Sequence, residues 1–275
     1  MYIFICEDST DGIFTGVYDA WASKYGHTNI MLTTQIPDNY SLFCEYITVQ
    51  TDYEKSAKVA RTLRNRMGEE TYGELCQAAC ALVDNSSRKK AIDKAEAIYK
   101  TIVLALSLPD SSKILHYLGE PYVNRVFQLS RSMGNEAHHL LGFLRFQELE
   151  NGVLLARIHP KNDVLVFLGE HFSDRLPLEN FMIYDETHRR AVLHPSGQGF
   201  FITDTEGLDM EALQHFSPDE LEYQKLWCRF FDSIAVEARV NPKLQNQNLP
   251  KRFQKDIVEF QRRNTDFKNT KLTSQ

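Results

Sequence analysis

The chain has 275 residues, of which 43% are hydrophobic and 25% are charged, and its formal net charge is −6. This composition is that of an ordinary globular protein, and the length is sufficient to bury a large core. No stretch approaches the roughly 20 consecutive apolar residues that a membrane-spanning helix needs, so we expect no membrane role.

The N-terminal apolar run, YIFIC at residues 2–6, is too short for the core of a signal peptide and has no basic start. Five cysteines are spread through the chain, namely Cys6, Cys44, Cys76, Cys80 and Cys228. An odd number in a chain of this size is typical of reduced thiols. We therefore expect a cytoplasmic protein.

The first 55 residues predict a strand, a helix and a second strand. The opening apolar run predicts the first strand, and apolar residues recur at helical spacing over residues 12–25. Residues 42–49 (LFCEYITV) are rich in β-branched and aromatic side chains and predict the second strand. From residue 52 the period changes to 3.6, which predicts helices near 52–67, 69–84, 87–107 and 120–142.

Residues 143–203 contain short apolar runs separated by turn signals. Asn151-Gly152 lies between two such runs, and this dipeptide is the strongest short-range signal for a β-hairpin. Residues 181–185 and 189–194 predict a second antiparallel pair, followed by a strand at 199–203. Residues 163–172 fit a short helix or a strand equally well.

Near the C-terminus, the sequence Ser217-Pro218-Asp219-Glu220 is a capping box and predicts the start of a helix. Asn241-Pro242 ends it, Leu249-Pro250 opens another helix, and residues 264–275 are polar enough to predict a disordered tail. We therefore predict one α+β domain over 1–263, with a small antiparallel sheet and several flanking helices. Its parts are a helical layer at 52–142, a hairpin region at 143–203 and basic helices at 217–263.

The sequence contains no phosphate-binding glycine loop, dinucleotide fingerprint, His-Glu-x-x-His or Gly-x-Ser-x-Gly motif. Cys76 and Cys80 are four residues apart on a predicted helix, but no second Cys/His pair accompanies them at ligand spacing. Small buried helical residues are the better interpretation of this pair. We expect no metal site and no cofactor.

Histidines and arginines gather in the hairpin region, together with Asp174 and Asp185. The members of this group are His159, His171, His188, His194, Arg157, Arg175, Arg189 and Arg190. His171 and Arg175 share a face if their segment is helical, and Asp185 ends a predicted strand just before the turn that leads to the two adjacent arginines.

This arrangement predicts one polar pocket in which His171, Arg175 and Asp185 are the candidate catalytic residues. In such a pocket an arginine holds a phosphate and a histidine exchanges protons. The alternative is that these side chains face water at the edges of hairpins and only stabilise the turns.

The charge is unevenly distributed along the chain. The first 55 residues carry eight acids and two lysines, whereas residues 239–271 carry nine bases and three acids. Basic residues near the C-terminus alternate with aromatic ones, a pattern found in nucleic-acid-binding surfaces. Aromatic residues at helical spacing are, however, more often part of a hydrophobic core. The charged residues also fit a solvated helix face without any partner. The candidate nucleic-acid contacts are Arg229, Arg239, Lys243, Lys251, Arg252 and Lys255.

Several segments together resemble a bacterial family of DNA-metabolism proteins that contains a domain of unknown function. They are YIF at 2–4, DGIFTGVYDAW at 11–21, GFLRF at 142–146, HFSDR at 171–175, IYD at 183–185, WCRFF at 227–231, ARVNP at 238–242 and LPKRF at 249–253. Their order and spacing make the resemblance specific, and it covers most of the chain.

The resemblance implies a context in DNA repair or modification. Members are paired with a radical-SAM protein for DNA modification or repair, and a similar domain is fused to a uracil-DNA glycosylase in some bacteria. We therefore expect a DNA-binding accessory protein with a radical-SAM partner. One alternative is an enzyme that acts directly on damaged or modified nucleotides, and another is a protein scaffold without DNA contact.

Overall fold

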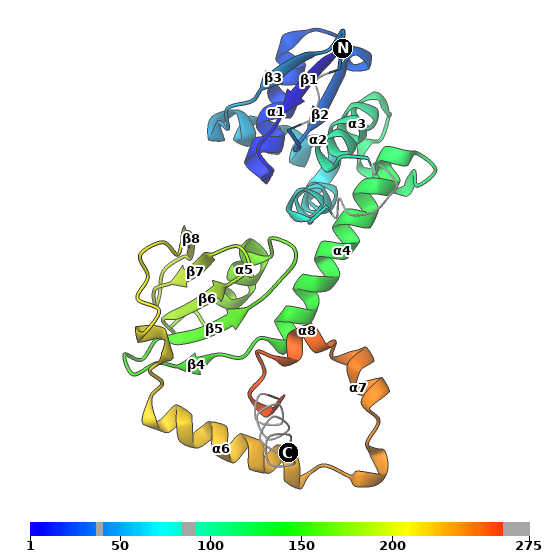
Figure 1. Cartoon of the computed structure of the whole chain (residues 1–275). Coiled ribbons are helices and arrows are strands. Elements are labelled where there is room, and N and C mark those ends of the chain that lie inside the picture. Colours follow the sequence, from blue (N-terminus) through cyan, green and yellow to red (C-terminus); the bar gives the residue numbers. More distant parts are fainter. Residues whose placement is uncertain (37–40, 84–91, 261–275) are drawn as a thin grey trace. The chain divides into compact units, whose positions relative to one another are not determined.

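The computed structural model describes residues 1–36, 41–83 and 92–260. These residues form two compact units, residues 1–135 and residues 136 onward (Figure 1), and the boundary lies inside helix α4 (Pro121–Phe143). Within the described ranges, no helix is both long and apolar enough to cross a membrane. The expectation that residues 1–263 behave as a single domain stays a prediction, and the expected tail at 264–275 lies outside the described residues.

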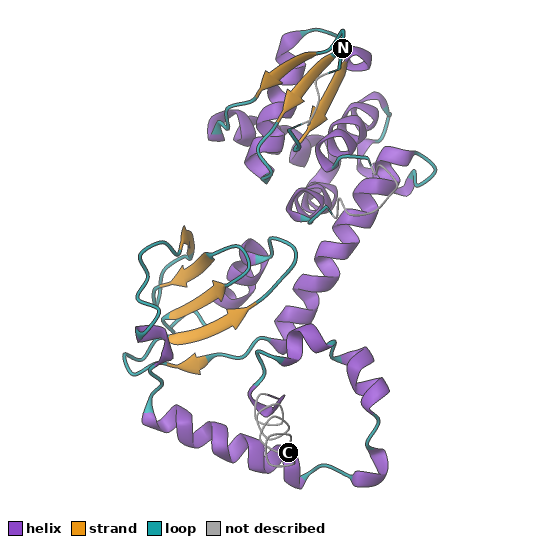
Figure 2. Cartoon of the chain, in the orientation of Figure 1, coloured by secondary structure: helices purple, strands orange, loops and turns teal. Residues whose placement is uncertain are grey.

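The sheet of the first unit has three parallel strands. They are β1 (Tyr2–Ile5), β2 (Ile30–Thr33) and β3 (Glu45–Thr48), in the order β2-β1-β3 (Figure 2). Helix α1 (Thr10–Ser23) returns the chain to the start of β2, and such a crossover makes the two strands parallel. The prediction of an antiparallel sheet is therefore wrong for this unit, and β2 was not predicted.

Helix α1 packs closely on β1. The Ser9 hydroxyl oxygen caps the helix by accepting a hydrogen bond from the Gly12 backbone N–H at 3.0 Å, and Phe14 and Val17 are buried. Gly16 faces the strand, where an added Cβ atom would lie 2.2 Å from the Cys6 sulfur. This close approach requires glycine, and it seats the helix on the sheet.

The helices of the first unit follow the predicted period. Helix α2 (Tyr53–Cys80) is interrupted at Gly68, whose φ of 85° and ψ of 165° are non-helical, so its two halves correspond to the helices predicted at 52–67 and 69–84. Helix α3 (Lys94–Ser107) confirms most of the helix predicted at 87–107, although residues 92 and 93 precede it and residues 87–91 lie outside the described residues. Helix α4 confirms the helix predicted at 120–142, and the short helices η1 (His27–Asn29) and η2 (Ser111–His116) connect these elements.

The sheet of the second unit has five strands in the order β4-β5-β6-β7-β8. Their bounds are β4 (Gln147–Glu148), β5 (Leu154–Ile158), β6 (Phe181–Asp185), β7 (Arg190–His194) and β8 (Phe201–Asp204). Both predicted antiparallel pairs are present, β4 with β5 at the Asn151-Gly152 hairpin and β6 with β7, and the strand predicted at 199–203 is β8, which is antiparallel to β7. Strands β5 and β6 are parallel because helix α5 (Leu165–Arg175), which resolves the open assignment of 163–172, crosses between them.

The C-terminal elements are η3 (Ala212–Gln214), α6 (Pro218–Ser233), η4 (Glu237–Arg239), α7 (Pro242–Asn248) and α8 (Lys251–Gln254). The predicted start of α6 is confirmed, since the Ser217 hydroxyl oxygen accepts from the Glu220 backbone N–H at 3.1 Å. The Glu220 carboxylate does not close the capping box but accepts from the Glu148 backbone N–H at 3.3 Å. The helix start is thereby tied to β4, and the chain as a whole has the predicted α+β fold class.

Candidate functional site

Titratable side chains gather where β5 and β6 end. Strand β5 leads into His159, and β6 ends with Asp185 followed by Glu186. Because the two strands are parallel, their carboxyl ends meet at one edge of the sheet, which is the edge where open α/β sheets bind ligands. This edge is therefore the candidate functional site of the second unit.

His159 lies between two carboxylates. Its Nε2 is 2.8 Å from Glu186 Oε2 and its Nδ1 is 3.0 Å from Asp256 Oδ2, while Arg157 Nη1 is 3.5 Å from Glu186 Oε1. A neutral imidazole has one N–H group and can donate to only one of two ionised carboxylates. Both contacts are hydrogen bonds only if one further proton is present, either on the ring or on one of the two carboxyl groups. Burial raises the pKa of the Asp256 carboxyl, which favours retention of that proton.

Asp185 and His188 form a second pair. The Asp185 side chain is fully buried, and its Oδ2 lies 2.6 Å from His188 Nδ1. Its Oδ1 accepts from the backbone N–H groups of Thr187 and His188 at 2.9 and 3.1 Å. The hydrogen bond to the carboxylate raises the pKa of His188, and it directs the other ring nitrogen away from the pair. An aspartate that orients a histidine in this way is a common arrangement for acid–base chemistry.

Arg190 and Asp163 lie beside this pair. Arg190 Nη1 is 2.8 Å from Asp163 Oδ2, and both residues contribute electrostatically to the pKa of His188. Asp163 Oδ1 is buried and has no hydrogen-bond partner within the described part of the chain. The edge thus holds a histidine, a guanidinium and a carboxylate oxygen that is not saturated.

The structure joins the predicted Asp185 to His188 rather than to His171. His171 and Arg175 are exposed on α5, and the described contacts include no hydrogen bond or ion pair between either of them and Asp185. The His171 ring contacts only the edge of Phe172, at 5.0 Å between centroids, among the described ring pairs. Catalytic roles for His171, Arg175 and Asp185 stay predictions.

A local sequence signal for His188 exists in the spacing Asp-x-x-His directly after a strand, which places the histidine in the turn that the aspartate caps. His194 has a different environment. It is buried, its ring stacks on Phe181 with centroids 4.5 Å apart, and its Nδ1 lies 2.9 Å from the Glu179 carbonyl oxygen. This histidine is a satisfied core residue.

Five of the six candidate nucleic-acid contacts are exposed, namely Arg229, Arg239, Lys243, Lys251 and Lys255. Arg252 is different, because its Nη1 lies 2.6 Å from Oε1 of Glu136, a residue with 1% exposure. Its guanidinium also lies over the Phe253 ring, at 4.4 Å from the centroid. Arg252 therefore neutralises a buried carboxylate, while the other five side chains are exposed to solvent.

An apolar stripe runs along the exposed side of α6. It comprises Tyr223, Trp227, Phe230 and Ile234, which are 68%, 44%, 53% and 57% exposed. These positions recur at helical spacing and hence share one face, whereas Cys228, on another face, is the buried residue of this helix. Of the aromatic residues expected to be core, Phe253 and Phe260 are buried, but Trp227 and Phe230 are not. We call these four residues the α6 stripe.

Within the described residues, no group of three or more His, Cys, Asp or Glu side chains is arranged to hold a metal ion. A family model described as a domain of unknown function (DUF4130) matches residues 92–259, which is more than half of the chain. The match includes the sheet edge with His159 and His188, the α6 stripe and the exposed cations. No curated protein matches the chain.

Proposed function

We propose, from the premise that the chain belongs to the family of the domain of unknown function DUF4130, that it is an accessory protein which binds a protein partner and DNA. In this proposal α6 contacts the partner, and the exposed cations between Arg229 and Lys255 contact DNA. The resemblance stated above supplies the class of partner, a radical-SAM protein for DNA modification or repair.

The α6 stripe is the observation that carries the proposal. Its four large side chains are exposed on one helix face, and burying a side chain of this kind contributes about 1.5–3 kcal/mol. Leu226 lies next to the stripe and is 52% exposed. Exposed aromatic residues at helical spacing are typical of a helix that inserts into a groove of another protein.

The excess of basic residues near the C-terminus supports the proposed contact with DNA. Between residues 225 and 255 the sequence has seven bases and two acids. Exposed cations of this kind neutralise phosphates and release counterions.

The test is association between the purified chain and the radical-SAM protein of the same bacterium. We expect Phe230→Glu to abolish a micromolar complex, because it places a charge in the centre of the stripe. Lys225→Glu is the control, since it introduces the same carboxylate on a different face of the helix, with a larger change in net charge, and should bind normally. Equal binding by both variants would contradict the role of the stripe. Partner binding without any DNA binding would favour the scaffold alternative.

The Asp185–His188 pair favours a second candidate, an enzyme that acts on a damaged or modified nucleotide. In this reading His188 transfers protons and Arg190 binds a phosphate. The test compares His188→Ala with His171→Ala in an assay that follows damaged nucleotides in oligonucleotides in the presence of the partner. Loss of conversion only in His188→Ala supports this candidate. Equal conversion by both variants and the wild type would eliminate it.

A further inference from the structure

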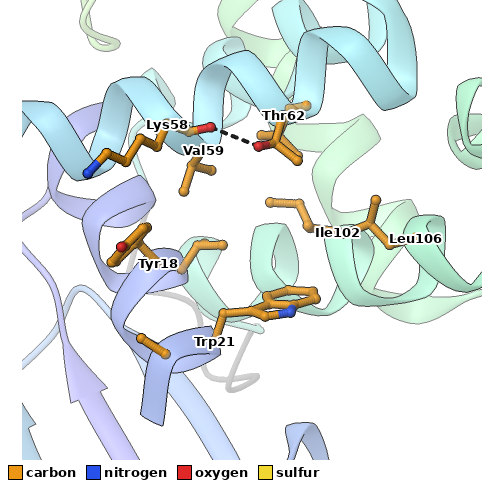
Figure 3. A pocket seen from close by; sticks show the side chains of 10 residues that line it. Tyr18, Trp21, Lys58, Val59, Thr62, Ile102 and Leu106 are labelled. Atoms are coloured by element: carbon orange, nitrogen blue, oxygen red, sulfur yellow. Dashed lines mark hydrogen bonds between the residues drawn. The ribbon is translucent and has the colours of Figure 1, made fainter. Parts of the chain in front are cut away.

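A cavity of about 380 Å³ opens between α1, α2 and α3 in the first unit (Figure 3). Its walls are mainly aliphatic and aromatic, and small-molecule sites start at about this volume. The lining side chains include Tyr18, Trp21, Lys58, Val59, Thr62 and Ile102.

Two aromatic rings from α1 form one side of the cavity. Trp21 is 38% exposed, and it is supported from behind by His27, whose ring centroid lies 4.4 Å away. His27 is fixed in turn, since its Nδ1 lies 2.7 Å from the Tyr99 hydroxyl. Figure 3 shows Trp21 across the open space from Val59, with Ile102 beside it. A flat ring that enters this space meets an indole and aliphatic side chains.

Lys58 is the basic side chain among those that line the cavity. Between Lys55 and Arg66, helix α2 carries five cations and no acid. Lys55 pairs with Asp19 at 2.7 Å, and Lys58 has no carboxylate within ion-pair distance in the described part of the chain. Lys58 Nζ lies 5.8 Å from the Tyr18 ring centroid, and Figure 3 shows this side chain running along α2 on the side of Tyr18. Arg61 is exposed one turn further along α2.

We infer that this cavity binds a nucleotide, with the base against Trp21 and the phosphate at Lys58 and Arg61. A ligand that carries both a flat apolar ring and an anionic group matches an aromatic wall beside an unpaired cation. The Thr62 hydroxyl donates to the Lys58 carbonyl oxygen at 2.9 Å, so its lone pairs are available to an amino group of the base. The choice of a nucleotide among aromatic anions rests on the proposed function in DNA metabolism.

The experiment uses fluorescence, because the chain has two tryptophans, Trp21 and Trp227. In Trp227→Phe, Trp21 is the only indole, and we expect saturable quenching by dAMP or dTMP and by a short single-stranded oligonucleotide. A nucleoside without phosphate should bind more weakly. Adding Lys58→Gln should weaken nucleotide binding roughly three- to tenfold, as for the loss of one partly exposed charged contact, without affecting the nucleoside. Arg64→Gln, a half-exposed cation on the opposite face of α2, is the matched control.

Each outcome decides the inference. Quenching by free nucleotides or by the strand alone supports it, and the two results distinguish a free ligand from a nucleotide within DNA. Absence of quenching by every nucleotide, or equally strong quenching by benzoate, overturns it. Replacing Arg229, Lys243 and Lys251 with glutamine should leave quenching by mononucleotides unchanged, so failure of the proposed DNA contacts is distinguishable from failure of this site.

Discussion

Asp185 lies at the end of β6, where its carboxylate favours the protonated form of His188. One carboxylate oxygen stabilises the turn by accepting from two backbone N–H groups, and the other faces His188 at 2.6 Å. The ion pair forms with little exposure of the carboxylate, so solvent screens it weakly. Stabilisation of the turn and the protonation of His188 therefore depend on the same side chain.

The first prediction concerns this pair. In Asp185→Asn the turn keeps its acceptor oxygen, but the charge that raises the His188 pKa is lost, so that pKa should fall toward its ordinary value of 6.5. Because the folded pKa is raised, the pair stabilises the wild type fully below about 6.5, and this contribution is lost as pH rises through the folded value. NMR titration of the imidazole checks the shift, and urea unfolding across this pH range checks the slope. An unchanged His188 pKa in the variant would contradict the assignment.

Arg252 illustrates why one basic residue in a run can have a structural role. Glu136 accepts from the backbone N–H groups of Lys161 and Asn162, from the Asn162 amide and from Arg252, at distances between 2.6 and 3.1 Å. The sequence around Arg252 resembles a nucleic-acid contact, but the carboxylate that it neutralises is 116 residues away. A contact at that separation has no local signal.

The second prediction follows from this contact. We expect Arg252→Ala to lower the free energy of unfolding by about 2 kcal/mol, because it removes the cation that pairs with the buried Glu136 carboxylate. Lys251→Ala, at the adjacent exposed position, should stay within about 0.5 kcal/mol of the wild type. Urea denaturation of the three proteins measures the difference. Equal stability of both variants would contradict the structural role of Arg252.

At the scale of elements, Gly68 divides α2 into two helical segments. Its φ of 85° with ψ of 165° belongs to a region that is essentially restricted to glycine. An added Cβ atom at Gly68 would meet no other atom within 4 Å, so any effect of a side chain there comes from the backbone. Gly73 lies in the second segment and has the same open surroundings.

The third prediction uses these two glycines as a matched pair. Gly68→Ala should destabilise the protein by about 1–3 kcal/mol, because alanine does not tolerate this backbone conformation. Gly73→Ala should be neutral or stabilise by up to about 1 kcal/mol, because alanine is the better helix former. Thermal unfolding followed by circular dichroism measures both effects. Stabilisation by Gly68→Ala would mean that α2 is continuous in solution.

Most elements, but not their pairing, were predictable from the sequence. Helices α2, α3 and α4 are long enough for their period to be read, and the Asn151-Gly152 turn fixes its hairpin. Strand β2 is as short as β1 and β3, but it lacks the additional apolar and aromatic residues that mark those two strands in the sequence. Parallel pairing of β1 with β2 and of β5 with β6 depends on how helices return the chain, which no local pattern encodes.

The candidate site was only partly predictable for the same physical reason. The gathering of titratable residues near β6 was visible in the sequence, and Asp185 and Arg190 do lie at the sheet edge. His159 is joined to Asp256, which is 97 residues away, through contacts that only the folded chain brings together. Spacing along one helix, which indicates His171, is easier to read from a sequence than the geometry of the turn that holds His188.

At the scale of the whole molecule, the net charge of −6 repels DNA, so any DNA binding depends on local cations. The fourth prediction is that the full chain binds single-stranded DNA and that replacing Arg229, Lys243 and Lys251 with glutamine reduces the salt dependence of binding. The slope of log K against log salt is negative, and each lost phosphate contact should reduce its magnitude by about 0.7. The three substitutions together should thus reduce the magnitude of the slope by roughly two.

A control with the same change in net charge distinguishes phosphate contacts made by the segment from Arg229 to Lys255 from the effect of the protein's total charge. Replacing Lys113, Arg131 and Lys161 with glutamine also removes three exposed cations but leaves the segment from Arg229 to Lys255 intact. If this segment contacts phosphates, the control should keep the wild-type slope, because the slope counts released counterions. Fluorescence anisotropy with a labelled oligonucleotide between 50 and about 200 mM salt gives these slopes. Equal loss in both triple variants would show that binding follows the total charge, and the proposed interface would then be wrong.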